Sequence, residues 1–222
     1  MSSPRKRYNS SDCVLNINGV VIEQVDELKF LGVIIDNKFT WKSHVEYICT
    51  KIAKGIGILS RAKHKLYKNS LLTLYNTLIK PYFTYCVTVW GNTYKKYLNK
   101  LYMLQKKIVR ILTFSDYIAH TEELFKKLNM MTVNNLYEYF VGIFVYKSIN
   151  KKFPGLFCGI FSHNVTERNS VNLRPGLLTL RICEFSVKIT GPKIWNALSR
   201  QTKSAKSMYS FKKLLKKELF AR

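Results

Sequence analysis

Hydrophobic positions along this chain follow two spacings, and the change between them falls near residue 41. Before that point, short apolar runs are separated by turn-forming residues. The run 14–22 is divided by Asn18-Gly19, a pair typical of a two-residue β-hairpin turn. The next run, Lys29 to Asp36, is short and is closed by Asn37 and Lys38. Its pattern predicts a strand that is buried on both faces.

Gly32 interrupts the apolar run that begins at Lys29. A residue without Cβ lets another backbone or a ligand approach closely. A glycine at such a place also marks a β-bulge. The spacing alone leaves both interpretations open.

From Ser43 onward, apolar residues recur three and four positions apart, which predicts amphipathic helices. Ser43 and Glu46 have the spacing of a capping box and place the first helix start. Pro81 is expected to break a helix that Asn69-Ser70 caps. The other predicted helices are Tyr82 to Trp90, Tyr94 to Ile111, Thr121 to Asn129, Thr132 to a point before Pro154, and one capped by Ser207 or Ser210 that runs through Leu219.

The helical pattern is lost between Phe153 and Pro175, which is the best candidate for a linker. The segment Leu177 to Ile189 predicts one or two short strands. Gly191-Pro192 predicts a turn, and Lys193 to Leu198 predicts at least one helical turn. The fold class is therefore mainly α-helical (α+β), with a small N-terminal β-hairpin and strand element and a short β plus helix region at the C-terminus. Three parts are expected: residues 1–40, 41–152 and 153–222.

The charge of the chain changes this picture of a helical domain. The chain has 37 Lys and Arg against 13 Asp and Glu, a formal net charge of +24, while 47% of its residues are hydrophobic. A basic chain with enough apolar residues to fold points to a polyanionic partner, either nucleic acid or an anionic membrane. Aromatic residues interleaved with lysine favour nucleic acid, because rings stack on bases. Most of these rings are nevertheless expected in the core.

Two predicted helices carry the candidate binding residues. A basic face of this kind is usually only solvated, but few acids lie nearby to neutralise it, so phosphate contact is an equal alternative. The one membrane candidate, Leu71 to Trp90, has Lys80 and Pro81 at its centre, so two buried helices are preferred there. The predicted nucleic-acid-binding residues are Lys51, Lys54, Arg61, Lys106, Lys107 and Arg110.

No pattern in the sequence indicates catalysis or a metal site. The phosphate-binding, dinucleotide, zinc-protease and hydrolase signatures are absent. Polymerase metal chemistry needs clustered carboxylates, whereas the four aspartates are scattered. The four histidines are expected at the surface or as caps. Five widely spaced cysteines without zinc spacing predict reduced thiols, and hence an intracellular protein of the nucleus or cytoplasm. The segment Pro4 to Arg7 is either a weak nuclear address or a solvated tail.

A set of short motifs then combines in a recognisable order. The motifs are Lys29-Phe30-Leu31-Gly32-Val33-Ile34-Ile35-Asp36, Trp41-Lys42-Ser43-His44, Leu74-Tyr75, Ile79-Lys80-Pro81-Tyr82, Tyr85, Val89-Trp90-Gly91, Leu104-Gln105-Lys106-Lys107, Arg110-Ile111 and Gly191-Pro192-Lys193-Ile194-Trp195-Asn196. Each motif alone is weak, but their order is specific. Over nearly the whole chain, this order closely resembles the C-terminal part of reverse transcriptases from non-LTR (LINE-type) retrotransposons of the jockey-like kind.

The resemblance implies roles for the three predicted parts. Residues 1–40 would be the end of the polymerase palm, with Lys29, Phe30, Leu31 and Gly32 in the primer grip. Residues 41–152 would form a helical thumb-like bundle that holds the template–primer duplex, and residues 153–222 a post-thumb region. The partner would be RNA or an RNA–DNA duplex, and an intact element-encoded polymerase is a second expected partner. Neither a membrane nor a small-molecule substrate is expected.

The chain departs from the family pattern in one respect. The Tyr-x-Asp-Asp loop of the palm, whose aspartates hold Mg²⁺, would lie upstream of Met1. The expectation is a truncated fragment of an RNA-directed DNA polymerase that does not polymerise by itself, needs no cofactor and binds a nucleic-acid duplex. Two alternatives stay open. One is a non-functional pseudogene remnant that folds poorly because its strand edges are exposed. The other is a basic membrane-surface protein.

Overall fold

The computed structural model describes residues 16–154, 160–161, 172–173 and 186–221. Within them the chain is mainly helical, with two small antiparallel strand pairs near the N-terminus, which confirms the predicted fold class. The predicted C-terminal strands fall mostly on residues outside the described part. The strands are β1 (Asn16–Ile17), β2 (Val20–Val21), β3 (Glu27–Phe30) and β4 (Val33–Asp36). The helices are α1 (Lys42–Ala62), α2 (Lys68–Leu78), α3 (Lys80–Thr84), α4 (Val87–Trp90), α5 (Lys95–Thr113), α6 (Glu122–Lys127), α7 (Val133–Ile149), α8 (Val187–Asn196), α9 (Arg200–Lys203) and α10 (Met208–Ala221).

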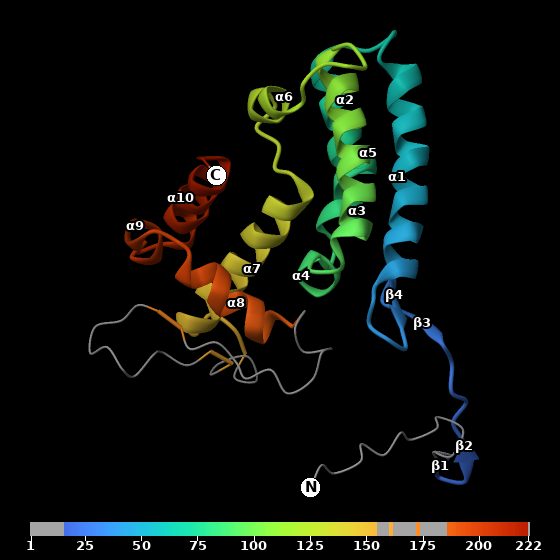
Figure 1. The fold of residues 1–222 in the computed structure, drawn as a ribbon, viewed down its shortest axis with the longest axis vertical. Helices are drawn as coiled ribbons and strands as arrows, with labels where there is room; N and C mark the ends of the chain where they lie inside the picture. The colour runs from blue at the N-terminus through green and yellow to red at the C-terminus, as the bar shows by residue number, and fades with distance from the viewer. Residues whose placement is uncertain (1–15, 155–159, 162–171, 174–185, 222) are drawn as a thin grey trace, which may run out of the picture.

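The helices form two neighbouring groups (Figure 1). In the first, α1 and α5 run side by side in the same direction, and α2 to α4 bring the chain back between them. In the second, α7 packs against α8 and α10. The hairpins β1–β2 and β3–β4 lie at the end of the first group where α1 begins. This end of α1 is therefore where the N-terminal strands meet the helices.

The first hairpin has the turn that the sequence predicts. Asn18 and Gly19 both have positive φ, 51° and 83°, and Ile17 pairs with Val20. Two consecutive residues with positive φ are the mark of the turn that best matches strand twist. All four residues of β1 and β2 are exposed, so this hairpin has no packing partner among the described residues.

The single strand predicted from Lys29 is wrong, because the run folds into a second hairpin. β3 and β4 pair antiparallel, with Phe30 opposite Val33, and Leu31 and Gly32 form the turn with φ of 46° and 84°. Burial on both faces is also wrong, since every residue of β3 is exposed. The turn is hidden in the sequence because Leu31 is a poor turn former. Gly32 is not a bulge, and no other backbone approaches it closely, since a Cβ there would meet only the Tyr85 ring at an ordinary 3.7 Å. Close approach of a ligand stays a prediction. The positive φ is what requires glycine.

Helix starts follow the predictions only in part. The capping box is wrong: α1 begins at Lys42, and the Ser43 hydroxyl donates instead to a Glu27 carboxylate oxygen. The loop before α1 is held by the Asp36 carboxylate, which accepts from the backbone N–H groups of Thr40 (2.9 Å) and Trp41 (2.7 Å). The predicted cap at Asn69-Ser70 is also wrong, since α2 begins at Lys68 without a side-chain cap. Thr132 and Ser207 do cap α7 and α10.

Pro81 and Pro192 act differently in the helices that contain them. The chain breaks between α2 and α3, and Pro81 sits in the first turn of α3, where a missing N–H costs nothing. Pro192 lies inside α8, so the turn predicted there is wrong. The strand predicted as far as Ile189 is wrong over Val187–Ile189, which are helical. Packing favours the helix, because Gly191 lies so close to Val145 that a Cβ would approach it to 3.0 Å. No helix among the described residues is long and apolar enough to cross a membrane.

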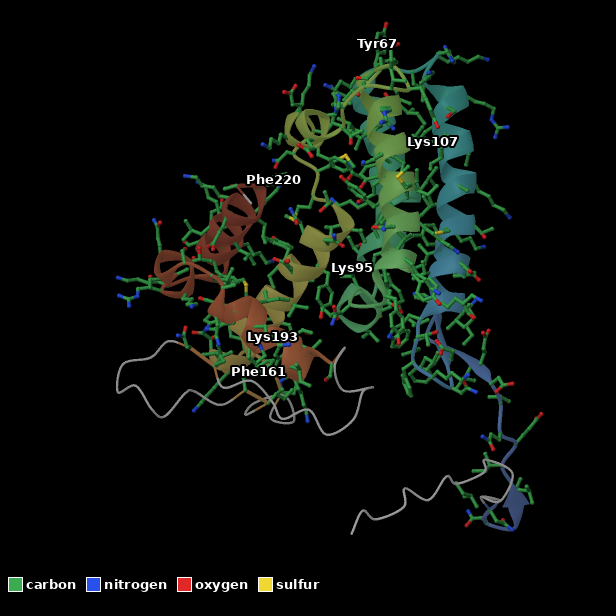
Figure 2. The ribbon with its side chains drawn as sticks, in the orientation of Figure 1. Tyr67, Lys95, Lys107, Phe161, Lys193 and Phe220 are labelled. Carbon is green, nitrogen blue, oxygen red and sulfur yellow. The ribbon has the colours of Figure 1, made fainter. Side chains whose placement is uncertain are left out.

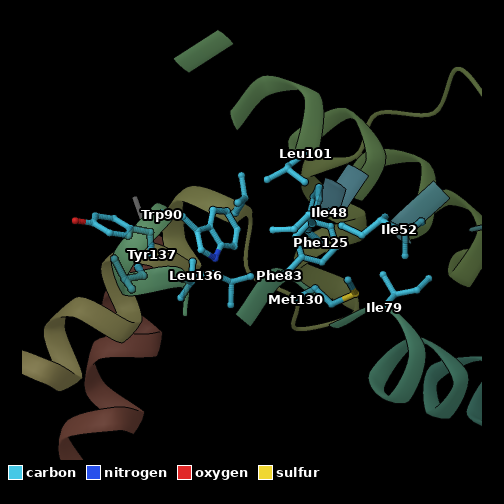
Figure 3. Close-up of a cluster of buried hydrophobic side chains, with 14 of the residues drawn as sticks. Ile48, Ile52, Ile79, Phe83, Trp90, Leu101, Phe125, Met130, Leu136 and Tyr137 are labelled. Carbon is cyan, nitrogen blue, oxygen red and sulfur yellow. The ribbon is translucent and has the colours of Figure 1, made fainter. Parts of the chain in front are cut away.

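The first group of helices and α7 share one hydrophobic core (Figure 3). Buried side chains from α1, α3, α4, α5 and α7 meet there, among them Ile52, Phe83 and Trp90. The buried amide of Gln105 fixes α5 to α7, because it accepts from Val133 N–H (2.7 Å) and donates to the Met131 carbonyl (3.3 Å). Satisfying both backbone groups makes a polar residue acceptable in this core.

The C-terminal helices join this core through stacked rings. Phe211 of α10 stacks on Tyr146 of α7, with ring centroids 4.3 Å apart, and lies 5.9 Å from the ring of Trp195. The Tyr146 hydroxyl donates to the Ala205 carbonyl at 2.9 Å. The predicted boundaries at residues 40 and 152 stay predictions, but contacts of this kind extend the core beyond the second one.

Candidate nucleic-acid interface

The turn of the β3–β4 hairpin is tied to the helices by one hydrogen bond. The Tyr85 hydroxyl, between α3 and α4, donates to the Leu31 carbonyl at 2.6 Å. Tyr85 is positioned in turn by Trp90, whose indole N–H donates to the Tyr85 carbonyl at 2.8 Å. Leu31 and Phe30 remain 74% and 59% exposed. The residues predicted as a primer grip thus form a fixed but solvent-facing tip.

A cavity of about 360 Å³ lies beneath this tip. Its walls come from the hairpin turn, the start of α1 and the region around α3. Three tyrosine rings and a proline dominate them, and such rings offer flat faces to a base or sugar. The lining residues are Leu31, Gly32, His44, Tyr47, Ile48, Pro81, Tyr82 and Tyr85.

The ring of Tyr47 brings two of the predicted residues together. The Lys29 ammonium lies 5.1 Å from the centroid of this ring, and the Lys51 ammonium lies 5.4 Å from it. Lys29 belongs to β3 and Lys51 to α1, so the ring joins the hairpin to the basic face of the helix. Cation–π attraction offsets part of the repulsion between the two ammonium groups. Two positive charges therefore lie next to this ring.

His44 of α1 connects the β3–β4 hairpin to the helices. Its Nδ1 accepts from the Ile34 N–H at 3.3 Å, and its ring meets that of Trp90 edge-on at 5.7 Å. The side chain is buried, so the expectation of a surface or capping histidine is wrong at this position. Burial lowers the pKa of His44 to about 4, which keeps the ring neutral at pH 7. Its Nε2 has no hydrogen-bond partner among the described residues.

The predicted basic residues of α1 face solvent. Lys54 and Arg61 are exposed, and Lys51 is half-buried beside Tyr47. None of the six predicted cations forms an ion pair with a carboxylate of the described residues. The outer face of α1 is therefore open to an anionic partner.

On α5 the structure separates residues that the sequence grouped. Lys107, which is labelled in Figure 2, is exposed. Lys106 instead lies 4.6 Å from the centroid of the Tyr102 ring, which stacks on Phe125 of α6. Arg110 donates from Nε to the Ala119 carbonyl at 3.1 Å. These two cations are held on the α6 side of the helix, and their contact with phosphate stays a prediction.

Sequence reasoning missed the aromatic part of this site. Tyr47 and Lys51 are four residues apart, which places them on one face of a helix. That spacing was the available signal. Tyr82 and Tyr85 stood within the recognised motifs but had no assigned role. Only the folded chain brings them under the hairpin tip.

Comparison with known proteins adds the decisive observation. Over 121 residues the chain is 29% identical to the probable RNA-directed DNA polymerase from transposon X-element of Drosophila melanogaster, covering 53% of this chain and 13% of that protein. Over 118 residues it is 29% identical to the RNA-directed DNA polymerase from mobile element jockey of Drosophila funebris, covering 51% and 13%. Homologues of this chain are RNA-directed DNA polymerases of jockey-like non-LTR retrotransposons.

The jockey-like polymerases are much longer than this chain. The similarity extends to the probable polymerase from transposon BS of Drosophila melanogaster, at 24% identity over 54% of this chain and 14% of that protein. The chain thus matches about one-seventh of the length of these curated relatives. No family model and no solved structure matches it. The resemblance inferred from the motifs is confirmed over about half of this chain, whereas it was expected over nearly all of it.

Proposed function

We propose that this chain is the primer-grip and thumb portion of a jockey-like reverse transcriptase and that it binds a template–primer duplex. The observation that carries the proposal is the arrangement of Lys29 and Lys51 on the ring of Tyr47, beside the exposed turn Leu31-Gly32. Two cations next to an aromatic ring match the phosphate and base of one nucleotide. The outer face of α1 would continue the phosphate contacts along the duplex.

Under this proposal the chain contributes binding and positioning, and the chemistry belongs to the full-length parent. Two-metal polymerase chemistry requires carboxylates that converge on Mg²⁺. Asp36 is already engaged by the backbone N–H groups of Thr40 and Trp41, and no group of three or more metal-binding side chains occurs among the described residues. The palm of the parent polymerase would supply the Mg²⁺ site.

The test is binding of a fluorescent RNA–DNA hybrid, followed by anisotropy at several salt concentrations. The wild-type affinity should fall by orders of magnitude between about 50 and 200 mM salt, because binding releases counterions. The double variant Lys29→Gln/Lys51→Gln should bind less tightly and show a shallower salt dependence. A matched control is Lys212→Gln/Lys213→Gln, which removes the same charge from exposed positions on α10. An equal loss in both variants would contradict a specific interface.

One rival is favoured by a specific observation. Ile17, Val20 and Val21 are more than 60% exposed, so the first hairpin offers apolar edges that invite aggregation. A non-functional remnant that folds poorly would unfold broadly on heating and bind a hydrophobic dye. A sharp cooperative transition would oppose this rival. Flotation with anionic liposomes in the absence of nucleic acid would identify a membrane-surface protein instead.

A further inference from the structure

A second cavity, of about 410 Å³, has features that the proposed function does not use. It is enclosed by α2, α3, α7, α10 and the loop between α6 and α7. It shares no lining residue with the cavity beneath the hairpin tip. Its size falls in the range of pockets that hold small molecules.

Two lysines from distant parts of the chain face this cavity. Lys80 comes from the start of α3 and Lys216 from α10, and no aspartate or glutamate is among the lining residues. Burial in the cavity wall and, second, the charge of Lys80 lower the pKa of Lys216. Lys216 also lies 5.7 Å from the centroid of the Phe220 ring. Two like charges that converge without a carboxylate are stabilised by an anion placed between them.

Tyr75 adds a hydrogen-bonding group to the wall of this cavity. Its side chain is 5% exposed, it lines the same cavity, and its hydroxyl makes no hydrogen bond with the described residues. The hydroxyl oxygen is not among the buried polar atoms left without a partner, so it is open to the cavity, where a ligand could accept from it. Burial raises the pKa of Tyr75, which leaves the hydroxyl protonated and able to donate. A phosphate oxygen is a suitable acceptor.

The remaining walls supply flat apolar contacts. Tyr139 and Phe140 both line the cavity, and their rings lie nearly perpendicular with centroids 5.6 Å apart. An adjacent pair of rings offers a face or an edge to a heterocycle. The cavity thus combines sites for a phosphate and for a base.

We propose that this cavity binds one nucleotide, with its phosphate between Lys80 and Lys216 and within reach of the Tyr75 hydroxyl, and with its base against Tyr139 and Phe140. The inference does not depend on duplex binding at the hairpin tip. Two kinds of ligand would present such a nucleotide: a free mononucleotide and the phosphorylated end of a nucleic-acid strand.

Calorimetric titration of the full chain with AMP, inorganic phosphate and adenosine tests the site. AMP should bind more tightly than either of the other two probes. The variants Lys80→Gln and Tyr75→Phe should each weaken AMP binding, the first by about tenfold because it removes a charge-assisted contact. Lys212→Gln, an exposed position on the same helix as Lys216, should leave binding unchanged. Thermal melting should show that Lys80→Gln, at an exposed position, folds as stably as wild type.

Three results would overturn the inference: no binding of AMP, equal affinities for AMP and inorganic phosphate, or an equal loss in Lys80→Gln and Lys212→Gln. Competition distinguishes the two sources. Displacement of AMP by a 5′-phosphorylated oligonucleotide, but not by the 5′-hydroxyl form, would assign a strand end. AMP binding without such displacement would assign a free nucleotide. The Lys29→Gln/Lys51→Gln variant should still bind AMP when it no longer binds the hybrid. Each of the two proposals can therefore fail without the other.

Discussion

The Tyr85 hydroxyl reaches across 54 positions of sequence to donate a 2.6 Å hydrogen bond to the carbonyl of Leu31. This bond connects the exposed turn of the hairpin to the junction of α3 and α4. It therefore sets where the hairpin tip stands relative to α1. Together with the Ile34–His44 and Ser43–Glu27 bonds, it holds the strand that carries Lys29 beside Tyr47.

Replacing Tyr85 by Phe should loosen the hairpin without unfolding the helices. One exposed hydrogen bond contributes about 0.5–1.5 kcal/mol, so the free energy of unfolding should change little. Backbone amides of β3 and β4 should exchange faster with deuterium, and affinity for an RNA–DNA hybrid should fall several-fold. Tyr67→Phe, at a site 89% exposed, is the matched control. Unchanged exchange in β4 would show that this bond does not hold the hairpin.

Two glycines of α1, two positions apart, should respond in opposite directions to alanine. A Cβ at Gly57 would meet nothing within 4 Å, so Gly57→Ala should stabilise the helix by about 0.5–1 kcal/mol. A Cβ at Gly55 would lie 2.6 Å from Ile79 Cγ1, so Gly55→Ala should destabilise the fold by about 1–3 kcal/mol. Urea denaturation of both variants measures the difference. The prediction fails if both substitutions shift the midpoint in the same direction.

Acid should weaken the fold through His44. Its pKa is about 4 in the folded chain and 6.5 as a free side chain, so the unfolded chain binds the proton first. Stability is therefore complete above about pH 6.5 and falls as the pH drops toward 4, by roughly 3 kcal/mol at most. Denaturation curves at pH 7 and pH 5 should differ accordingly. His44→Gln, which can still accept from Ile34 N–H, should reduce the difference, whereas His64→Gln at an exposed position should leave it.

Removing the side-chain amide of Gln105 should lower the free energy of unfolding even when the volume of the side chain is kept. Gln105→Leu keeps the volume but leaves the Val133 N–H buried without an acceptor, which costs about 1–3 kcal/mol. Gln105→Glu restores that acceptor and should recover part of the loss when the two variants are compared by thermal unfolding. Equal melting temperatures for the wild type and the Leu variant would mean that water replaces the amide.

The long helices α1, α5 and α7 were predictable from sequence because their apolar spacing defines them. The second hairpin was not, since Phe30, Leu31 and Val33 form one continuous apolar run and only backbone φ reveals the turn. Pro192 misled for the opposite reason: the local preference for a turn is overridden by packing of Gly191 against Val145. Sequence patterns indicate the local conformation that a residue favours, and tertiary contacts decide which conformation it adopts.

The candidate site was likewise predictable from sequence only in part. Cations on helix faces can be read from spacing, so Lys51 and Lys54 were found. Which cations are open to a partner depends on neighbours, and Tyr102 and the Ala119 carbonyl already engage Lys106 and Arg110. The tyrosine-lined cavity requires segments more than 50 residues apart and leaves no trace in any one of them.

The hydrogen bonds around α1 also decide where this chain can be cut. Ile34 bonds to His44, Glu27 to Ser43, and Asp36 to Trp41, and each of these bonds crosses the position after residue 40. A helical fragment that starts there would lose the Asp36 carboxylate that holds the residues before α1, and the strand that packs against α1. A minimal fragment of the helical bundle should therefore begin before Glu27, so that it contains the β3–β4 hairpin together with α1.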